Sequence, residues 1–489
     1  MRSWRPLVQS SQTTYGIGYD KSDAGHIVSL IGRVQPSLSR YWEHEGTSTM
    51  VRHHTCQHGR RLAVVAVALG LAAACSAGGS GSSGSSAGGP GVAYGSKPDA
   101  YAEALKDADP ITIDLGGLTT GPGAESSAAF VEYGDLVEEM SGGKIVFKYD
   151  FGGAKVSLDK MTAGMKQGRI DMGLYIPAYE PDEWPLTSAI AEAAYLNDPN
   201  PVLGRIATFA ALIDFGASWE PLQEESERHG IRPLYTLYSP SDLKLQCGSG
   251  IAPLESLDDF EGKQVRVASG NHAGLAKAFG AVPVSLTFPE LFTGLQRGVV
   301  DCAVNTVSGS GAGGFHDITD SWTVGTEPGG DWGETPSGWG ISRSKWQSYP
   351  LAAQQLLWDT QPRMLELVLE ASARETYASI ALSKEAGMSF GTYSQELTDA
   401  AHAHYAQQDE ITADRIEELG ATEDGAKVIS GLKDSFATWW TIVREQYPDA
   451  AELTWENFTD ELDPDLAEID MAPITDRLFE EVLLEHRPE

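Results

Sequence analysis

The segment GMKQGRIDMGL at residues 164–174 has a counterpart, GLQRGVVDCAV, at residues 294–304, 130 residues later. Both segments read Gly, three residues, Gly, two residues, Asp and then apolar residues. Apolar residues at helical spacing precede the second glycine in each copy. That glycine, Gly168 or Gly298, is the residue type that ends a helix at little cost, because it readily adopts a left-handed conformation. Each copy therefore predicts a helix, a glycine turn and a buried strand.

The surrounding sequence continues this alternation. Residues 111–118 and 145–149 have the apolar, β-branched composition of strands, with an amphipathic helical pattern between them. In the second block, residues 263–269 and 281–286 predict strands that flank a helical segment. Alternating strands and helices are typical of parallel sheets covered by helices. The expected fold class is therefore α/β with two lobes, although a chance repetition of the motif would indicate α/β and nothing more.

Composition and charge restrict the function. The chain has 489 residues, of which 41% are hydrophobic and 21% charged, enough for a sizeable core and roughly two to four domains. It contains 35 Lys and Arg against 69 Asp and Glu, a formal net charge of −34. Nucleic acid is therefore not an expected partner, because phosphate binding requires clustered basic residues.

The N-terminal region is typical of an exported protein. Arg60 and Arg61 precede an apolar run at residues 62–74, which is too short to span a bilayer and suits a signal peptide. Small residues before Cys75 resemble the lipobox of bacterial lipoproteins, which implies that Cys75 is lipidated. The sequence departs from that pattern because Leu71 lies four places before the cysteine rather than three. A secretory signal that is cleaved nearby without lipidation is the alternative.

These features predict a domain organisation. Met50 suits the true start of the signal peptide, so residues 1–49 are interpreted as a misassigned leader. The Gly/Ser composition after Cys75 predicts a flexible tether. A lipid anchor followed by this tether would place the folded part outside the cytoplasmic membrane and attached to its surface. The expected regions are a signal peptide (50–74), the lipidated cysteine and tether (75–97), a two-lobe domain (98–447) and a peripheral acidic C-terminal extension (448–489). Within the domain we expect a first lobe at about 110–240, a second lobe at about 241–345 and a helical brace at about 346–447.

Five phrases in order carry a family resemblance. They are LVEEMSGGKIVFKYDFGG (136–153), GMKQGRIDMGLYIPAY (164–179), LDDFEGKQVRV (257–267), AVPVSLTFPELFTGLQRGVVDCAVNT (281–306) and SGWGISRSKWQSYPLAAQQLL (337–357). From residue 111 to about residue 447 the chain resembles the extracytoplasmic solute-binding proteins of TRAP transporters, the tripartite ATP-independent periplasmic carriers of organic acids. The resemblance implies a two-lobe fold that closes over a carboxylate ligand at the hinge. It also implies small and large membrane subunits as partners, and no cofactor.

The resemblance assigns candidate ligand-binding residues. Arg266 matches the family's carboxylate-binding arginine, Phe288 its cleft aromatic and Asn305 an asparagine that helps to hold the carboxylate. Three further candidates, Tyr175, Ile176 and Tyr179, follow the first-lobe strand. The family often has a second basic residue in the strand before residues 250–257; it is not clearly present here, and Lys244 is the nearest basic residue. Without the resemblance, Arg266 would be interpreted as the partner of one of the many acidic residues.

The cysteines predict one disulfide. Of the four, Cys56 leaves with the leader and Cys75 carries lipid, so that Cys247 and Cys302 remain in an oxidising compartment. The family places both beside strands near the hinge. Two buried thiols are the alternative to a Cys247–Cys302 bond.

Catalytic motifs are absent from the sequence. It contains no Gly-x-Ser-x-Gly elbow and no P-loop, and the spacing of His402 and His404 places them on different faces of a helix, so no metal site is expected. The chain is therefore expected to be a binding protein and not an enzyme. A ligand sensor for a membrane receptor and a secreted hydrolase are the alternatives; neighbouring genes for two membrane subunits would distinguish transport from sensing.

Overall fold

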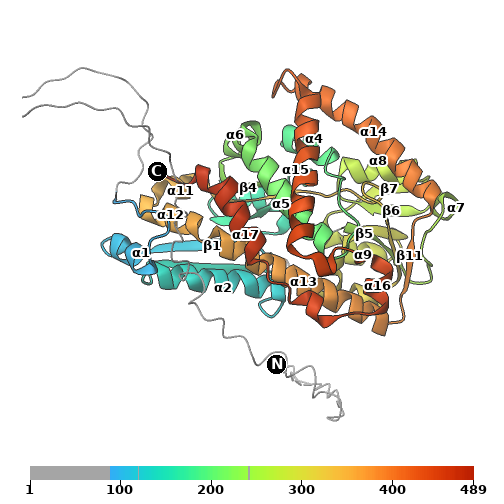
Figure 1. Cartoon of the computed structure of the whole chain (residues 1–489), viewed down its shortest axis with the longest axis horizontal. Coiled ribbons are helices and arrows are strands. Elements are labelled where there is room, and N and C mark those ends of the chain that lie inside the picture. Colours follow the sequence, from blue (N-terminus) through green and yellow to red (C-terminus); the bar gives the residue numbers. More distant parts are fainter. Residues whose placement is uncertain (1–88, 119–120, 241–242) are drawn as a thin grey trace, which may run out of the picture. The chain divides into compact units, whose positions relative to one another are not determined.

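The computed structural model describes residues 89–118, 121–240 and 243–489. The predicted leader, the signal peptide and Cys75 lie outside these residues. The described residues belong to one compact unit, which contains two β-sheets covered by helices (Figure 1). This arrangement confirms the predicted two-lobe α/β fold. Within the described part of the chain, no helix combines the length and apolar character needed to cross a membrane.

The first sheet has five strands in the order β2-β1-β3-β10-β4. β1 pairs in parallel with β2 and β3, whereas β10 pairs antiparallel with β3 and β4. Its bounds are β1 (Ile111–Leu118), β2 (Ile145–Phe151), β3 (Met172–Tyr175), β4 (Ile231–Tyr238) and β10 (Ser337–Ser342). Ile113, Leu115 and Trp339 of this sheet are buried in one hydrophobic core with the helices that cover it.

The second sheet has six strands in the order β11-β9-β5-β8-β6-β7. β6 lies in parallel between β7 and β8, and β5 runs antiparallel to both β8 and β9. Its bounds are β5 (Leu243–Gly248), β6 (Gln264–Val267), β7 (Val282–Ser285), β8 (Cys302–Thr306), β9 (Thr319–Val324) and β11 (Ser389–Thr392). Leu245, Val265 and Val304 form a separate core with neighbouring helices.

Helices cover both sheets, and the longest of them, α13, runs along the lower edge of the view in Figure 1. The helices of the first half are α1 (Pro98–Leu105), α2 (Glu125–Met140), α3 (Met161–Lys166), α4 (Pro185–Glu192), α5 (Leu203–Ser218), α6 (Glu220–Arg228), α7 (Leu257–Phe260) and α8 (Gly270–Ala278). Those of the second half are α9 (Phe288–Gln296), α10 (Val307–Ala312), α11 (Arg343–Ser348), α12 (Leu351–Asp359), α13 (Gln361–Glu385), α14 (Gln395–Glu418), α15 (Gly425–Gln446), α16 (Trp455–Asp460) and α17 (Ala472–Leu478).

The repeated sequence motif builds the same unit in each lobe. Its helix is α3 in the first copy and α9 in the second, and its strand is β3 or β8. In both lobes that strand pairs in parallel with the first strand of its block, so that β2-β1-β3 and β7-β6-β8 have the same order. The repetition is therefore structural and not accidental.

Steric constraints explain why both positions of the motif are glycine. Gly168 and Gly298 adopt φ values of 69° and 67°, the left-handed region in which glycine avoids the strain of other residues. Gly164 and Gly294 lie inside their helices, where an added Cβ would approach a neighbouring side chain to 2.7 Å or 2.9 Å. The first glycine thus allows close packing and the second ends the helix.

The aspartate of the motif joins two strands. The Asp171 carboxylate accepts a hydrogen bond from the main-chain N–H of Asp114 at the middle of β1 (3.1 Å). In the second lobe, the Asp301 carboxylate accepts one from the N–H of Gln264 at the start of β6 (2.7 Å). Each aspartate thus accepts a hydrogen bond from a main-chain N–H of the strand that pairs in parallel with β3 or β8. This shared role explains why both copies carry the same residue type.

The lobes are less continuous along the chain than the sequence predicts. β10, expected at the end of the second lobe, inserts antiparallel between β3 and β4 of the first sheet. β11, expected within a helical brace, adds to the second sheet in parallel with β9. Both sheets are therefore mixed and not purely parallel, because the chain crosses between the lobes several times.

The C-terminal extension is part of the core, contrary to the expected peripheral position. Trp455, Phe458, Ile474 and Phe479 are each at most 4% exposed, and they belong to the same hydrophobic cluster as the first sheet. Arg487, near the chain end, forms two hydrogen bonds to the carboxylate of Asp359 at the end of α12, each of 2.7 Å. The acidic composition of this segment describes only its outer surface.

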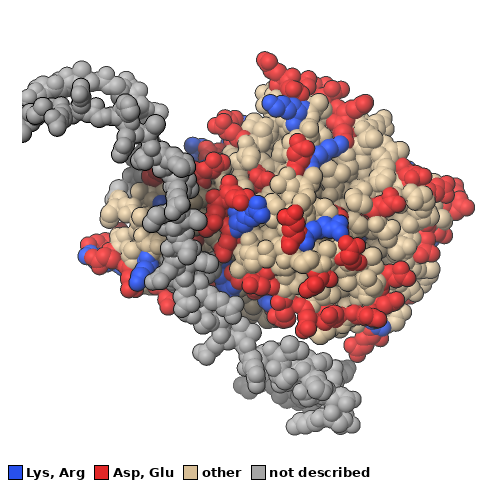
Figure 2. All heavy atoms as spheres, viewed as in Figure 1, with Lys and Arg blue, Asp and Glu red and all other residues tan. Residues whose placement is uncertain are grey.

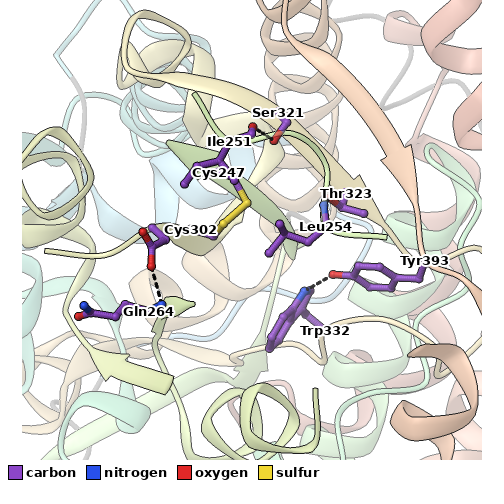
Figure 3. The surroundings of a disulfide bond; sticks show 10 residues. Cys247, Ile251, Leu254, Gln264, Cys302, Ser321, Thr323, Trp332 and Tyr393 are labelled. Atoms are coloured by element: carbon purple, nitrogen blue, oxygen red, sulfur yellow. Dashed lines mark hydrogen bonds between the residues drawn. A yellow bond between two sulfur atoms is a disulfide. The ribbon is translucent and has the colours of Figure 1, made fainter. Parts of the chain in front are cut away.

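A disulfide links Cys247 and Cys302, as the sequence predicts. The two residues face each other on the antiparallel strands β5 and β8. Figure 3 shows the bond together with neighbouring hydrogen bonds, including one of 2.7 Å from the Trp332 indole to the Tyr393 hydroxyl. The bond therefore fastens two central strands of the second sheet.

Removing this bond is expected to destabilise the protein measurably. The disulfide closes a loop of 55 residues, and a bond of this kind typically contributes about 2–4 kcal/mol. The double variant Cys247→Ala/Cys302→Ala should lose about that much free energy of unfolding in urea titration. An unchanged unfolding midpoint, or alkylation of both cysteines in the denatured but unreduced parent protein, would contradict the prediction.

Candidate ligand-binding cleft

A cavity of about 830 Å³ lies between the two lobes. The first lobe lines it with residues at the carboxyl ends of β1 and β3, including Leu118 and Leu174. The second lobe lines it with Arg266 of β6 and Asn305 of β8. Ligands in open α/β sheets bind at the carboxyl ends of the strands. The fold therefore places this cavity where a ligand held by both lobes would lie.

Arg266 is fixed at the wall of this cavity. Its side chain is buried, with only 3% of the residue exposed. The Nε atom donates a hydrogen bond to the main-chain oxygen of Leu286 (2.8 Å), and one terminal nitrogen donates to that of Val304 (2.7 Å). These two bonds orient the guanidinium group and leave further N–H donors for other acceptors, since arginine carries five.

Among the described residues, no carboxylate forms an ion pair with Arg266, whose hydrogen-bond partners are the main-chain oxygens of Leu286 and Val304 and the neighbouring Tyr179 hydroxyl. Burial lowers the pKa of Arg266, and the nearby Tyr179 and Glu290 oppose that effect. Since an arginine side chain does not lose its proton in proteins, the group remains a buried cation. A buried cation without a counter-ion is stabilised by an anion that enters the cavity.

Tyr179 connects the two lobes beside Arg266. Its hydroxyl oxygen accepts a hydrogen bond from the main-chain N–H of Phe288 (3.1 Å), which lies in the other lobe. Burial raises the pKa of Tyr179, while Arg266 partly lowers it. The tyrosine therefore remains neutral and keeps its own proton for donation.

Asn305 lines the cavity next to this arrangement. Its side-chain nitrogen donates to the Gln246 side-chain oxygen (2.8 Å), and its side-chain oxygen accepts from the N–H of Thr306 (2.9 Å). These bonds hold the amide in one orientation. One N–H of the amide remains available to a ligand, since the group has two.

The remaining walls are mostly apolar and aromatic. Phe288 and Ile176, both expected in the cleft from the sequence, line the cavity. Phe288 lies close to Phe315, with ring centroids 6.3 Å apart. The aromatic residues that the sequence analysis did not identify are Phe130, Tyr238, Phe292, Phe315 and Trp339. Such walls favour a ligand with an apolar body.

Two predicted residues lie away from the cavity. Tyr175 is fully buried, stacks on Trp184 with ring centroids 5.1 Å apart and hydrogen-bonds to the Ser226 hydroxyl (3.1 Å). Lys244 forms an ion pair with Asp331 (2.8 Å), and its Nζ lies 5.5 Å from the centre of the Trp455 ring. Neither residue belongs to the cavity lining.

Two carboxylates in the cavity wall were missed by sequence reasoning. Glu334 and Glu375 both line the cavity, from the segment before β10 and from α13. In an acidic chain, single glutamates outside any motif give no signal for a site. The described residues contain no group of three or more His, Cys, Asp or Glu side chains arranged to hold a metal ion.

The surface outside the cavity is strongly acidic. Figure 2 shows Asp and Glu side chains spread over this face, with fewer Lys and Arg. A surface of this charge repels small anions at long range. A buried cation such as Arg266 is therefore the local feature that would favour an anionic ligand.

The fold and cleft define a two-lobed solute-binding protein, and a family model supports this class. The model described as "Bacterial extracellular solute-binding protein, family 7" matches residues 119–412, more than half of the chain. The chain belongs to this family, which confirms the predicted resemblance. Among curated proteins, a solute-binding protein of Roseobacter denitrificans is 25% identical over 225 residues, which cover 45% of this chain and 64% of that protein. The chain thus spans slightly less than two thirds of that relative's length.

A shorter match concerns the ectoine-binding periplasmic protein TeaA of Halomonas elongata. It is 33% identical over 72 residues, which cover 14% of this chain and 21% of that protein. Because the match is short, it supports the family and not a ligand.

Solved structures share the fold. A TRAP periplasmic solute binding protein of Desulfovibrio salexigens with bound orotic acid has a TM-score of 0.56 and 18% identity, covering 67% of this chain and 99% of its own. The sugar acid binding protein of Advenella mimigardefordensis in complex with galactonate has a TM-score of 0.57 and 17% identity, covering 67% and 100%. A TRAP solute binding protein of Rhodoferax ferrireducens with copurified benzoate has a TM-score of 0.56 and 15% identity, covering 68% and 99%. At these identities the likeness establishes the fold alone.

Proposed function

We propose that this protein is an extracytoplasmic receptor that binds a small organic acid in the inter-lobe cavity and delivers it to the membrane subunits of a TRAP-type transporter. The observation that carries the proposal is Arg266, a buried cation at the wall of a cavity shared by both lobes, with no carboxylate partner among the described residues. A guanidinium grips a carboxylate through two parallel hydrogen bonds. The protein is proposed to bind its ligand without converting it.

The proposed site residues have distinct roles. Arg266 anchors the carboxylate, and Asn305 and Tyr179 donate hydrogen bonds beside it. Phe288 and Ile176 contact the body of the ligand. Tyr179 and Phe288 come from different lobes and are already hydrogen-bonded to each other. A ligand that contacts both residues would therefore stabilise the closed arrangement, which the membrane subunits would then recognise.

The relatives support an acid as ligand. Structures with the same fold hold orotic acid, galactonate and benzoate. These ligands share a carboxyl group and differ in the rest of the molecule, which is consistent with a cleft that anchors a carboxylate.

Native mass spectrometry of the protein purified without added ligand tests the proposal. A bound mass that disappears on denaturation and corresponds to an organic acid is expected. Isothermal titration calorimetry against a panel of monocarboxylic, dicarboxylic, sugar and aromatic acids then measures its affinity. The proposal fails if no acid copurifies and none in the panel binds below 1 mM, the order of a weak affinity.

We further propose that Cys75 carries lipid and holds the protein at the outer face of the cytoplasmic membrane. The sequence order of basic residues, apolar run, alanines, Cys75 and Gly/Ser tether supports this proposal. Dual acylation gives a stable anchor, whereas one chain is marginal.

The variant Cys75→Ala is expected to appear in the soluble extracytoplasmic fraction instead of the membrane fraction. Globomycin, which blocks lipoprotein signal cleavage, should make the parent accumulate as precursor and leave the variant unaffected. Membrane association of Cys75→Ala equal to that of the parent would show that Cys75 is not the anchor.

A further inference from the structure

The charges of the cavity wall are unequal. Among the described lining residues, Arg266 is the single cation, while Glu334 and Glu375 are the carboxylates. One cation holds one carboxylate group. A ligand with a second carboxylate would have to place it in a wall that contains acidic side chains and no further described cation.

Glu375 is the carboxylate best placed to accept a hydrogen bond from a ligand. It projects from α13, and its Oε1 accepts a hydrogen bond from the main-chain N–H of Ser126 in the first turn of α2 (2.9 Å). The residue is only partly buried and lines the cavity. Burial raises the pKa of Glu375 and Glu125 adds to this effect, whereas the Ser126 hydrogen bonds and Arg374 lower it. A second carboxylate placed against the charged Glu375 side chain would be repelled by it.

Glu334 is already held by the protein. Its two oxygens accept hydrogen bonds from the Asn197 side-chain nitrogen (2.9 Å) and the Ser239 hydroxyl (2.6 Å). It therefore adds negative charge to the wall. Among the described residues, the hydrogen bonds of Glu375 come from Ser126 alone, and a carboxylate can accept further ones because it has about four lone-pair sites.

The two charged residues Arg266 and Glu375 belong to different lobes. Arg266 lies in the second sheet, hydrogen-bonded beside β8, and Glu375 lies against the start of α2 in the first lobe. In addition, Phe130 and Trp339 of the first lobe stack with ring centroids 4.7 Å apart, and the rings of Phe292 and Phe315 of the second lobe have centroids 5.5 Å apart. All four rings belong to residues that line the cavity.

We infer that the ligand is a monocarboxylate with a flat apolar body and a hydrogen-bond donor, a hydroxyl or amino group, at the end remote from its carboxylate. Arg266 holds the carboxylate, the aromatic walls hold the body, and Glu375 accepts the hydrogen bond of the donor. Dicarboxylates are rejected because their second carboxylate meets Glu375. This inference rests on the proposed function and specifies the substrate class of the same site.

Two matched series of acids test the inference by calorimetry on the full chain at pH 8. The first contains benzoate, 4-hydroxybenzoate and terephthalate; the second contains 3-phenylpropanoate, 3-(4-hydroxyphenyl)propanoate and 3-(4-carboxyphenyl)propanoate. In at least one series, the hydroxy acid is expected to bind at least tenfold more tightly than the unsubstituted acid. The dicarboxylate is expected to bind at least tenfold more weakly than the unsubstituted acid.

The outcomes separate this inference from the proposed function. A dicarboxylate that binds as tightly as the hydroxy acid overturns the inference and leaves the organic-acid receptor intact. If neither series binds, the copurified acid decides: a dicarboxylate, or an acid without a distal donor, overturns the inference, and a monocarboxylate with a donor supports it. If no organic acid binds at all, the proposed function itself fails.

The variant Glu375→Gln tests the role of this residue. The amide oxygen can still accept from Ser126, so the start of α2 keeps its partner, but the charge is gone. The penalty for the dicarboxylate is expected to shrink at least tenfold, while the unsubstituted acid binds within threefold of the parent. Glu370→Gln on the same helix, outside the cavity lining, is the matched control and should keep the parent's selectivity. Unchanged selectivity in Glu375→Gln overturns the assignment.

Discussion

Arg266→Ala is expected to abolish most of the ligand affinity while the protein remains folded. Truncating one partner of a buried, hydrogen-bonded charge pair costs about 2–5 kcal/mol or more, which corresponds to roughly 30-fold to several thousand-fold weaker binding. The reason is that the ligand carboxylate would lose the single cation found among the described lining residues, whose other charged members are acidic. Calorimetry with the acid found in the purified protein measures the change.

A second variant keeps this prediction independent of folding. Arg266 also donates to the main-chain oxygens of Leu286 and Val304, so alanine removes two structural hydrogen bonds. Arg266→Lys keeps the charge but loses the two-point geometry, and it should bind more weakly than the parent and more tightly than alanine. Arg232→Ala, on a strand of the other sheet and outside the lining, is the control. Parental affinity in folded Arg266→Ala would refute the carboxylate anchor.

Lys244→Met is expected to destabilise the protein by about 3–5 kcal/mol, because breaking a buried ion pair leaves one charge uncompensated. The side chains of Lys244 and Asp331 are 3% and 9% exposed, and their charged atoms lie 2.8 Å apart. Lys244 is the second residue of β5, which follows β4 of the other sheet along the chain, and Asp331 lies in the connection from β9 back to β10. The pair therefore ties two of the crossings between the lobes. Urea denaturation measures the loss.

Two further variants show whether the loss comes from the uncompensated charge. Adding Asp331→Asn to Lys244→Met removes the remaining charge, and the double variant should recover much of the lost stability. Lys155→Met breaks an ion pair of similar length (3.0 Å) whose side chains are 45% and 34% exposed, and it should cost at most about 1 kcal/mol. Equal effects of Lys244→Met and Lys155→Met would contradict the argument from burial.

The surroundings of the Lys244–Asp331 ion pair also show what the C-terminal extension does in the fold. Trp455 covers Lys244, with the ammonium nitrogen 5.5 Å from its ring centre. Asn200, before α5, donates a hydrogen bond to the main-chain oxygen of Ala450 (2.8 Å). The extension therefore packs against the crossings between the lobes, a position that its acidic composition did not reveal.

The sequence alone determined the repeated unit and its location. Each copy of the motif has local reasons for its residues: a left-handed turn at Gly168 or Gly298 and a strand donor for Asp171 or Asp301. The glycine turn lies within the repeated unit, and each aspartate bonds to the strand that pairs in parallel with the unit's own strand, so both copies of the motif carry the same residues. The disulfide between Cys247 and Cys302 was predictable because these two cysteines remain after the leader and the lipidated cysteine are excluded. The position of Arg266 in the cleft was predictable from the family's motifs.

Tertiary structure alone decided which side chains face the cavity. Successive side chains of a strand point to opposite faces, and Leu174 and Ile176 line the cavity whereas Tyr175 between them packs on Trp184. β3 is covered on both faces, so its sequence shows no polar alternation that would indicate the ligand side. The insertion of β10, the pairing of Lys244 with Asp331 and the position of Glu375 join segments 87 or more residues apart. Contacts of that range depend on how the lobes pack and leave no periodic trace in the chain.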